Sequence, residues 1–275
     1  PVDMYFAKKP AETGHWHLAN RLVTGNSSGA VLFPSNCNAQ SQDSYKTDFT
    51  SMVGCADSQH TTFLAYMFKR HAGFDMVTYR GTTTAGTQIT HSLFAVPEMI
   101  WIKRRYGSNQ CWVVGHKDMA SSNPWDYHLG FDTNVVTDAV GMFNDTAPTK
   151  DHFTVGNDNR VNGGSDDLIA FLFRSVIGIS KVGTYTGTGS NGNTVTTGFQ
   201  PRFVLIRYLG GENWRILDTT RGWGSGNDKQ IRFSSNNAES SEDWGAPTST
   251  GFTLTASADT AYNKSGGGYI YYAHA

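Results

Sequence analysis

The sequence predicts an all-β protein made of tandem antiparallel β-sandwich repeats. The segment Pro97-Glu98-Met99-Ile100-Trp101-Ile102-Lys103-Arg104 returns as Pro201-Arg202-Phe203-Val204-Leu205-Ile206-Arg207-Tyr208, and a fainter copy, Asp3-Met4-Tyr5-Phe6-Ala7-Lys8-Lys9, opens the chain. Short apolar runs with strand-like patterning are bounded by Gly, Thr and Asn, while helical periodicity is almost absent. About seven such runs occur in each repeat, which is the density of an antiparallel sandwich.

A second anchor divides the chain into three repeats. It occurs as Phe63–Lys69, Leu168–Arg174 and Tyr269–Ala273. Both anchors recur at a spacing well above the ~20–50 residues of solenoid repeats, so each copy is expected to be a small domain. The predicted domains are therefore 1–72, 73–176 and 177–275. The joining segments are short and apolar rather than Gly/Ser-rich, which predicts a fixed angle between neighbours.

Hairpin-like segments precede only two of the three repeated strands. They start at Asp75–Gly81 and Lys181–Gly187, whereas the first copy begins inside its apolar strand. A sandwich lacking two strands exposes an apolar face and an unpaired edge. We therefore expect the first repeat to be completed from elsewhere, either by an earlier part of a longer polypeptide or by a strand from a neighbouring subunit.

The later parts of the repeats also correspond. Each is expected to contain a central turn, a short apolar strand, a Gly/Asn loop and a closing aromatic strand. The corresponding segments are Ser35–Ala39 and Ser235–Ala238 for the turn, Phe153–Val155 and Phe252–Leu254 for the strand, and Asn162–Gly164 and Asn263–Gly266 for the loop.

Composition excludes several classes of function. Charged residues make up 16% of the chain and the net charge is −1, so there is no electrostatic attraction for nucleic acid or an anionic membrane. No apolar run approaches the ~20 residues that a membrane helix needs. Three cysteines are too few for a disulfide framework. Cys37 and Cys55 could pair within the first repeat, but we expect free buried thiols.

Four motifs carry a resemblance to a known family. They are Tyr185-Thr186-Gly187, Gly198-Phe199-Gln200-Pro201, Asp218-Thr219-Thr220-Arg221-Gly222 and Gly251-Phe252-Thr253-Leu254. Their order resembles repeats of tail-fibre and other virion proteins of tailed bacteriophages, clearly over 74–275 and partly over 1–70. The resemblance implies a concanavalin A-like (lectin-like, jelly-roll) sandwich and a place in the virion. The second repeat has Gly115-His116-Lys117-Asp118 in place of the third motif, so that motif is not expected to be an essential site.

Two motifs that occur in enzymes are expected to be turns. Gly25-Asn26-Ser27-Ser28-Gly29 fits G-x-S-x-G, but a strand and not a helix follows it, which a nucleophile elbow does not allow. Gly187–Gly192 fits G-x-G-x-x-G, yet Thr194-Val195-Thr196 begins another strand and leaves no helix N-terminus for a phosphate. We predict no catalytic residue.

Metal sites are equally poorly supported. His15 and His17 share one face of a strand and could hold a metal together, but no third ligand is identifiable. Asn157-Asp158-Asn159 and Ser165-Asp166-Asp167 offer the oxygen ligands that Ca²⁺ prefers. We expect no metal and no cofactor, with Ca²⁺ in these loops as the alternative.

Tryptophans fall into two groups. Trp16, Trp112 and Trp214 follow the repeated strand at equivalent places, and we predict that they are structural core residues. Trp125, Trp223 and Trp244 lie among Gly, Asn, Ser and Asp, where an exposed ring could stack on a sugar or contact a protein. These three are the candidate ligand-binding residues.

The predicted function is a non-enzymatic virion structural or appendage protein of a tailed bacteriophage, such as a tail fibre. Its expected partners are other virion proteins, further copies of itself, and host-surface polysaccharide, where repetition multiplies a weak affinity. Two alternatives remain: a carbohydrate-binding module of a bacterial surface protein, and a capsule depolymerase.

Overall fold

The computed structural model describes residues 2–23, 30–42, 49, 62–131, 136–256 and 259–275. Strands hold 41% of the chain and helices 7%. Every described strand pair is antiparallel. The predicted all-β class is therefore confirmed. The Gly25–Gly29 motif and Cys55 lie outside the described residues.

The first repeat has the smallest of the three main sheets. Its strands are β1 (Met4–Lys8), β2 (His17–Asn20), β3 (Ala30–Val31), β4 (Ser41–Gln42) and β5 (Leu64–Phe68). Strand β1 lies between β2 and β5 in a three-stranded sheet, and β3 pairs with β4. The strands predicted around the two anchors of this repeat are thus present as β1 and β5.

The second repeat has a four-stranded sheet in the order β6-β13-β8-β9. Its elements are β6 (Phe74–Arg80), β7 (Thr87–Thr90), β8 (Met99–Arg104), β9 (Val113–His116), the 3₁₀ turn η2 (Pro124–Asp126), β10 (Tyr127–His128), β11 (Thr137–Asp138), α1 (Val140–Phe143), β12 (His152–Val155), α2 (Asn159–Asn162) and β13 (Asp167–Phe173). A second layer consists of the β12-β7 pair and the two single-turn helices.

The third repeat has a six-stranded sheet in the order β14-β22-β16-β17-β18-β19, and a three-stranded sheet in the order β15-β21-β20. Its elements are β14 (Ser180–Thr186), β15 (Asn193–Thr196), β16 (Phe203–Tyr208), β17 (Arg215–Asp218), η3 (Thr219–Arg221), β18 (Asp228–Arg232), β19 (Ser240–Glu242), β20 (Gly245–Thr248), β21 (Gly251–Leu254), the π-helical turn η5 (Asp259–Asn263) and β22 (Gly268–His274).

Each of these two repeats packs its larger sheet against a second layer. In the third repeat, Val204 and Ile206 of β16 bury their side chains with Phe252 and Leu254 of β21. In the second repeat, the equivalent face of β8 packs against β7, β12 and the helical turns. Alternate residues of a strand point to opposite faces, so these contacts use only one face of each main strand.

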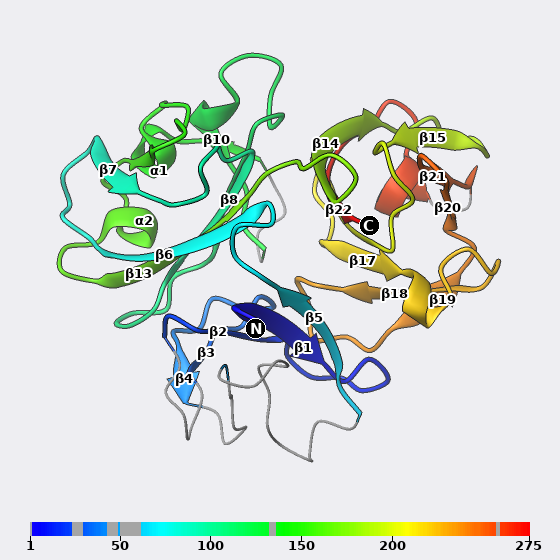
Figure 1. Cartoon of the computed structure of the whole chain (residues 1–275), viewed down its shortest axis with the longest axis horizontal. Helices are drawn as coiled ribbons and strands as arrows, with labels where there is room; N and C mark the ends of the chain where they lie inside the picture. The colour runs from blue at the N-terminus through cyan, green and yellow to red at the C-terminus, as the bar shows by residue number, and fades with distance from the viewer. Residues whose placement is uncertain (1, 24–29, 43–48, 50–61, 132–135, 257–258) are drawn as a thin grey trace.

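The opposite faces of the three main sheets meet in one shared core. Phe6 of repeat 1 lies 4.9 Å from Phe233 of repeat 3 between ring centroids, and Trp101 of repeat 2 lies 5.8 Å from the same ring. The repeats surround this core as three lobes (Figure 1). The sharing explains why the repeated strands are apolar on both faces. The three repeats bury their inner faces together, while repeats 2 and 3 each have a second core of their own.

The repeated tryptophans connect the lobes in a ring. Each indole N–H donates to a backbone carbonyl of another repeat: Trp16 to Arg232 at 2.7 Å, Trp112 to Phe33 at 3.0 Å, and Trp214 to Gly130 at 3.1 Å. Repeat 1 therefore bonds to repeat 3, repeat 2 to repeat 1, and repeat 3 to repeat 2. We call this closed arrangement the ring of repeats.

Buried lysines repeat the same connections. Lys8 donates to the Asn236 carbonyl at 2.9 Å, and Lys103 to the Cys37 carbonyl at 2.8 Å. The side chains of both lysines are almost fully buried, and carbonyl acceptors satisfy a buried ammonium that would otherwise be costly. The turns predicted to match at 35–39 and 235–238 are thus the places where one repeat receives a lysine from another.

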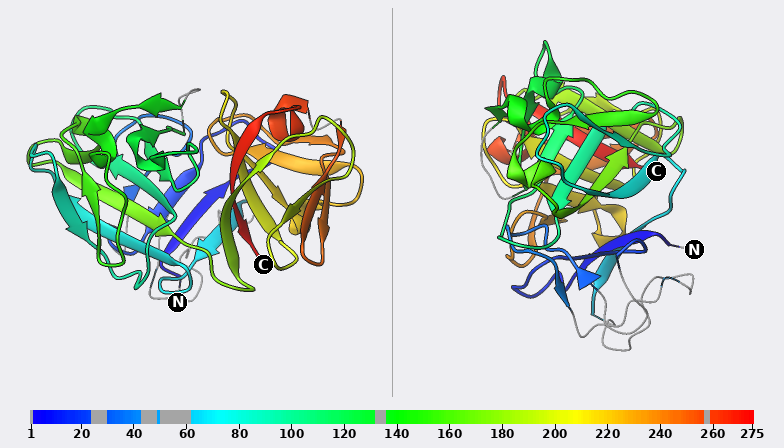
Figure 2. Two further views of the ribbon diagram at one scale, coloured as in Figure 1. Left: turned by 90° about the horizontal axis from the view of Figure 1, so that it is seen from above. Right: turned by 90° about the vertical axis from the view of Figure 1, so that its left-hand side faces the viewer.

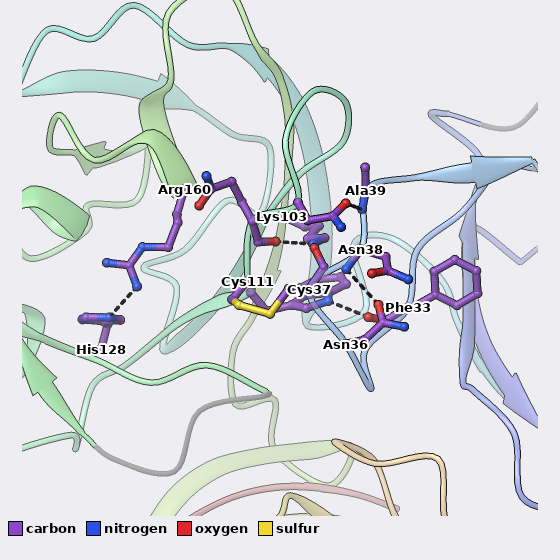
Figure 3. The surroundings of a disulfide bond; sticks show 12 residues. Phe33, Asn36, Cys37, Asn38, Ala39, Lys103, Cys111, His128 and Arg160 are labelled. Carbon is purple, nitrogen blue, oxygen red and sulfur yellow. Dashed lines mark hydrogen bonds between the residues drawn. A yellow bond between two sulfur atoms is a disulfide. The ribbon is translucent and has the colours of Figure 1, made fainter.

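A disulfide fastens one of these junctions. Cys37 in the turn of repeat 1 is bonded to Cys111, directly before Trp112 of repeat 2 (Figure 3). The expectation of free thiols, with Cys37–Cys55 as the alternative pair, was wrong. It assumed that pairing partners lie in one repeat, whereas the ring brings the Cys37 turn against the next repeat.

Candidate functional site

A pocket of about 370 Å³ lies where repeat 1 meets repeat 3. One wall is the whole of strand β5. The other wall is built from the start of β16 at Phe203, the end of β17 at Asp218, and the end of β22 at His274. These three strand ends come together because antiparallel pairing puts Phe203 opposite both Asp218 and His274.

The pocket is lined by all five residues of β5, which has one edge without a partner strand among the described residues. In the described part of the chain, β5 pairs only with β1. The equivalent closing strands of the other repeats, β13 and β22, pair on both edges, with β6 and β14 on the side where β5 is open. The hairpins that the sequence shows for repeats 2 and 3 supply these extra strands.

A hydrogen-bonded ionic network forms the polar part of the pocket. The Tyr66 hydroxyl donates to the Asp218 carboxylate at 2.7 Å, and the Arg221 guanidinium donates to the same carboxylate at 2.5 Å. Arg221 also pairs with Glu239 at 3.3 Å. Burial, together with the nearby carboxylate, raises the pKa of Tyr66 well above its ordinary value, so the phenol remains a donor. The network ties repeat 1 to repeat 3.

The network explains the Asp-x-x-Arg-Gly motif. Asp218 accepts from the Arg221 backbone N–H at 3.0 Å and so caps the turn η3. The strand registers place Asn20 and His116 at the equivalent positions of repeats 1 and 2, opposite Met4 and Met99. Asp218 joins repeat 3 to repeat 1 through Tyr66, whereas Asn20 and His116 accept backbone N–H groups of their own repeats, from Leu22 and Asp118.

Six exposed apolar side chains lie near equivalent strand ends of the sheets. They lie after β2, near the end of β5, before β8, and between β13 and β14, all at the end where β1, β8 and β16 begin. They are Leu22, Met67, Phe94, Val96, Ile177 and Ile179, six of the eight exposed large hydrophobic residues in the described part of the chain. Both termini lie on this side (Figure 2). Exposed apolar side chains at these positions are available for contact with another protein.

The tryptophans are all buried. Trp16, Trp112 and Trp214 are at most 1% exposed. The candidate ligand-binding residues Trp125, Trp223 and Trp244 are between 4% and 6% exposed. Their polar neighbours in the sequence suggested open loops, but each ring packs within a sandwich, for example Trp223 against Phe252 with 5.9 Å between centroids. As placed, these three rings offer no face to a sugar.

His15 and His17 both pack edge-on against the ring of Phe33, with centroid distances of 5.9 Å and 5.7 Å. His15 also exchanges a hydrogen bond with Ser35 at 2.8 Å. Among the described residues, no group of three or more His, Cys, Asp or Glu side chains could hold a metal ion.

The two loops considered for Ca²⁺ direct their carboxylates to arginines. Asp158 accepts from the backbone and side chain of Arg160 at the start of α2. Asp166 pairs with Arg104 at 2.8 Å. These contacts neutralise the charges that would attract a cation.

Two buried asparagines organise the Gly/Asn loops. Asn162 and Asn263 are fully buried, and the side-chain oxygen of each accepts a backbone N–H from the preceding hairpin, that of Thr82 at 2.7 Å and Thr188 at 2.8 Å. The G-x-G-x-x-G segment is therefore held as a turn, but the expected hairpin loop is corrected, because it joins β14 of the six-stranded sheet to β15 of the three-stranded sheet. These asparagines were missed as structural residues, although their recurrence before the loop glycines was a visible signal.

Tyr66 was also missed. Its position in the second anchor made it one member of an apolar strand, and nothing local announced a polar partner more than a hundred residues away. No helix in the described part of the chain is long and apolar enough to cross a membrane.

Comparison with known proteins gives one match. Residues 54–275 fit a family described as a domain of unknown function, DUF7483. The matched region runs from before β5 through both complete repeats, so the open-edged strand belongs to it. Searches of curated proteins and of solved structures found no match. The chain is a member of the DUF7483 family.

Proposed function

We propose that this chain is a non-enzymatic structural or appendage module of a tailed-bacteriophage virion, such as part of a tail fibre or related attachment structure. In this proposal each repeat is a variant of the concanavalin A-like sandwich. The work of the module is assembly and spacing, with host-surface polysaccharide as a weak multivalent ligand.

The observation that carries the proposal is a set of exposed apolar side chains together with an open strand edge. Six exposed hydrophobic side chains lie near equivalent strand ends of the sheets, and one edge of β5 has no partner strand among the described residues. Exposed apolar groups and an open edge support contact with another protein. The repeat motifs resemble those of phage virion proteins, and this resemblance supports the assignment to a phage particle. The buried charged groups described above are engaged in joining repeats, which supports a structural role.

Location in the particle tests the proposal. Antibodies raised against the purified chain should label tail fibres or another external structure when phage particles are viewed by electron microscopy. A matched antibody against an unrelated cytosolic protein of the host serves as the control. Labelling of host cells but never of particles would contradict a virion role.

The two alternatives have separate tests. A carbohydrate-binding module should bind defined glycans on an array, and a depolymerase should shorten capsular polysaccharide on incubation. Because Trp125, Trp223 and Trp244 are buried, glycan binding should be unchanged in Trp223→Phe if it occurs. Strong dependence on that ring would favour the carbohydrate-binding alternative.

A further inference from the structure

We propose that the open edge of β5 is a docking site for an extended strand supplied by another polypeptide, which pairs antiparallel to Leu64–Phe68. The strand would occupy the place that β6 and β14 hold in the other two repeats. Addition of a strand to an exposed sheet edge is a general mode of peptide recognition, in which backbone hydrogen bonds give affinity and alternate side chains give specificity.

The three closing strands are equivalent residue by residue. Phe68, Phe173 and His274 each face the first residue of the repeated strand, at Met4, Met99 and Phe203. In repeats 2 and 3 a seven-residue ladder covers the other edge. In repeats 2 and 3 this edge of the closing strand is covered by β6 and β14. The equivalent edge of β5 has no covering strand among the described residues.

The registers specify the chemistry of the incoming strand. Met76 faces Phe171 and Val182 faces Tyr272, and both point into the shared core. The residue equivalent to Phe171 and Tyr272 in repeat 1 is Tyr66. The partner strand should therefore carry an apolar residue opposite Tyr66.

The neighbouring position should be polar. Asp75 faces Leu172 and Lys181 faces Ala273, and the equivalent residue of repeat 1 is Met67. Met67 is 46% exposed, so a charged partner residue opposite it can remain in contact with water. The expected partner is an extended segment in which apolar and polar residues alternate.

The surroundings of the edge favour a strand over a small polar ligand. Tyr66, Asp218 and Arg221 already satisfy one another, which leaves the backbone edge as the feature still open to a partner. A long open edge is normally covered or blocked in folded proteins because it promotes uncontrolled pairing. The pocket provides the room beside it.

This inference rests on the proposed function and adds a specific attachment edge to it. The inference can be wrong while the proposed function is still right. Labelling of virions tests the particle, whereas the following experiment tests the edge. A chain found in virions but unable to bind a strand would retain the first proposal and lose the second.

The probe is a pair of fluorescent peptides with capped ends, one with the sequence of Phe74–Arg80 and one with that of Ser180–Thr186. Their binding to the full chain is followed by fluorescence anisotropy, and hydrogen exchange locates the site. We expect saturable binding and slower exchange of the amides of Leu64–Phe68. The control peptides carry Met76→Asp or Val182→Asp and should bind at least about tenfold more weakly, because a charge enters the shared core.

A charge variant of the protein tests the register. Met67→Asp should weaken binding of the first peptide, because its Asp75 would lie opposite the new carboxylate. It should strengthen binding of the second peptide, because its Lys181 would lie there. Cross-strand charge pairs of this kind correspond to changes of about twofold to fivefold, and Met67→Lys should reverse both. Met67 is exposed, so both variants should fold, which circular dichroism checks.

Three results would overturn the inference. They are no binding of either peptide at about 1 mM, which is the weak end of specific recognition; equal binding of the Asp-substituted peptides; or slowed exchange only at strands other than β5.

Discussion

An indole N–H buried in a protein needs an acceptor, because an unpaired polar group in the interior is costly. Trp16, Trp112 and Trp214 find theirs in other repeats. The sequence could place these rings in the core from their recurrence. The sequence could not identify their acceptors, since every residue type has a backbone carbonyl and none is distinguished as an acceptor.

Trp214→Ala should lower the free energy of unfolding by about 3–5 kcal/mol through the cavity it leaves. Trp214→Phe should isolate the contribution of the hydrogen bond, because it removes the donor to the Gly130 carbonyl, which is worth about 0.5–1.5 kcal/mol. The matched control is Trp101→Phe, since the buried Trp101 N–H has no hydrogen-bond partner among the described residues. Urea unfolding measures all three. Equal losses for the two Phe variants would contradict a bond that stabilises the ring.

His116 gives a pH-dependent prediction. Burial, assisted by Lys117, lowers its pKa from 6.5 to about 3. Between these values the unfolded chain binds a proton that the folded chain does not, so the free energy of unfolding falls as pH drops, by up to about 1.4 kcal/mol per pH unit. The comparison variant is His116→Asn, which introduces the residue found at the equivalent position 20.

On going from pH 7 to pH 5, the free energy of unfolding of the native chain should fall by about 2 kcal/mol more than that of His116→Asn. Chemical denaturation at the two pH values measures it, and the other titrating groups cancel in the difference. A constant difference would mean that His116 is protonated in the folded chain or exposed to water.

At the scale of elements, the strands were the predictable part. The segments expected at 99–102, 153–155, 203–206 and 252–254 all lie within strands, because period-two patterning is a local property. The single-turn helices α1 and α2 were not predicted, since four residues are too few to show helical periodicity. The site depends on which repeat lies beside which, and spacing along the chain does not encode that.

The disulfide is testable at this scale. Cys37→Ser should lower the free energy of unfolding by about 2–4 kcal/mol, because the bridge closes a loop of 74 residues and restricts the unfolded chain. Cys111→Ser removes the same bridge and should cost a similar amount. Peptide mapping under non-reducing conditions should recover the Cys37–Cys111 pair. Recovery of Cys37–Cys55 would contradict the structure.

At the scale of the whole molecule, the shared core predicts one cooperative unit. Unfolding followed by tryptophan fluorescence and by circular dichroism should give a single coincident transition in urea, since no repeat can open without exposing the inner faces of the others. Two or three separated transitions would show that the repeats are independent domains after all.

The ring of repeats also has a consequence in time. The contacts that close it join residues far apart in the chain, 216 residues for the Trp16 bond and 228 for the Lys8 bond. At about 5–20 residues per second, synthesis needs roughly 10–40 s to pass from Trp16 to its acceptor. During that interval the inner face of the first repeat has no partner to cover it. Contacts of such long range also form slowly. Closure of the ring should therefore be a late step in maturation, and the nascent first repeat is the stage at which the protein most needs a chaperone.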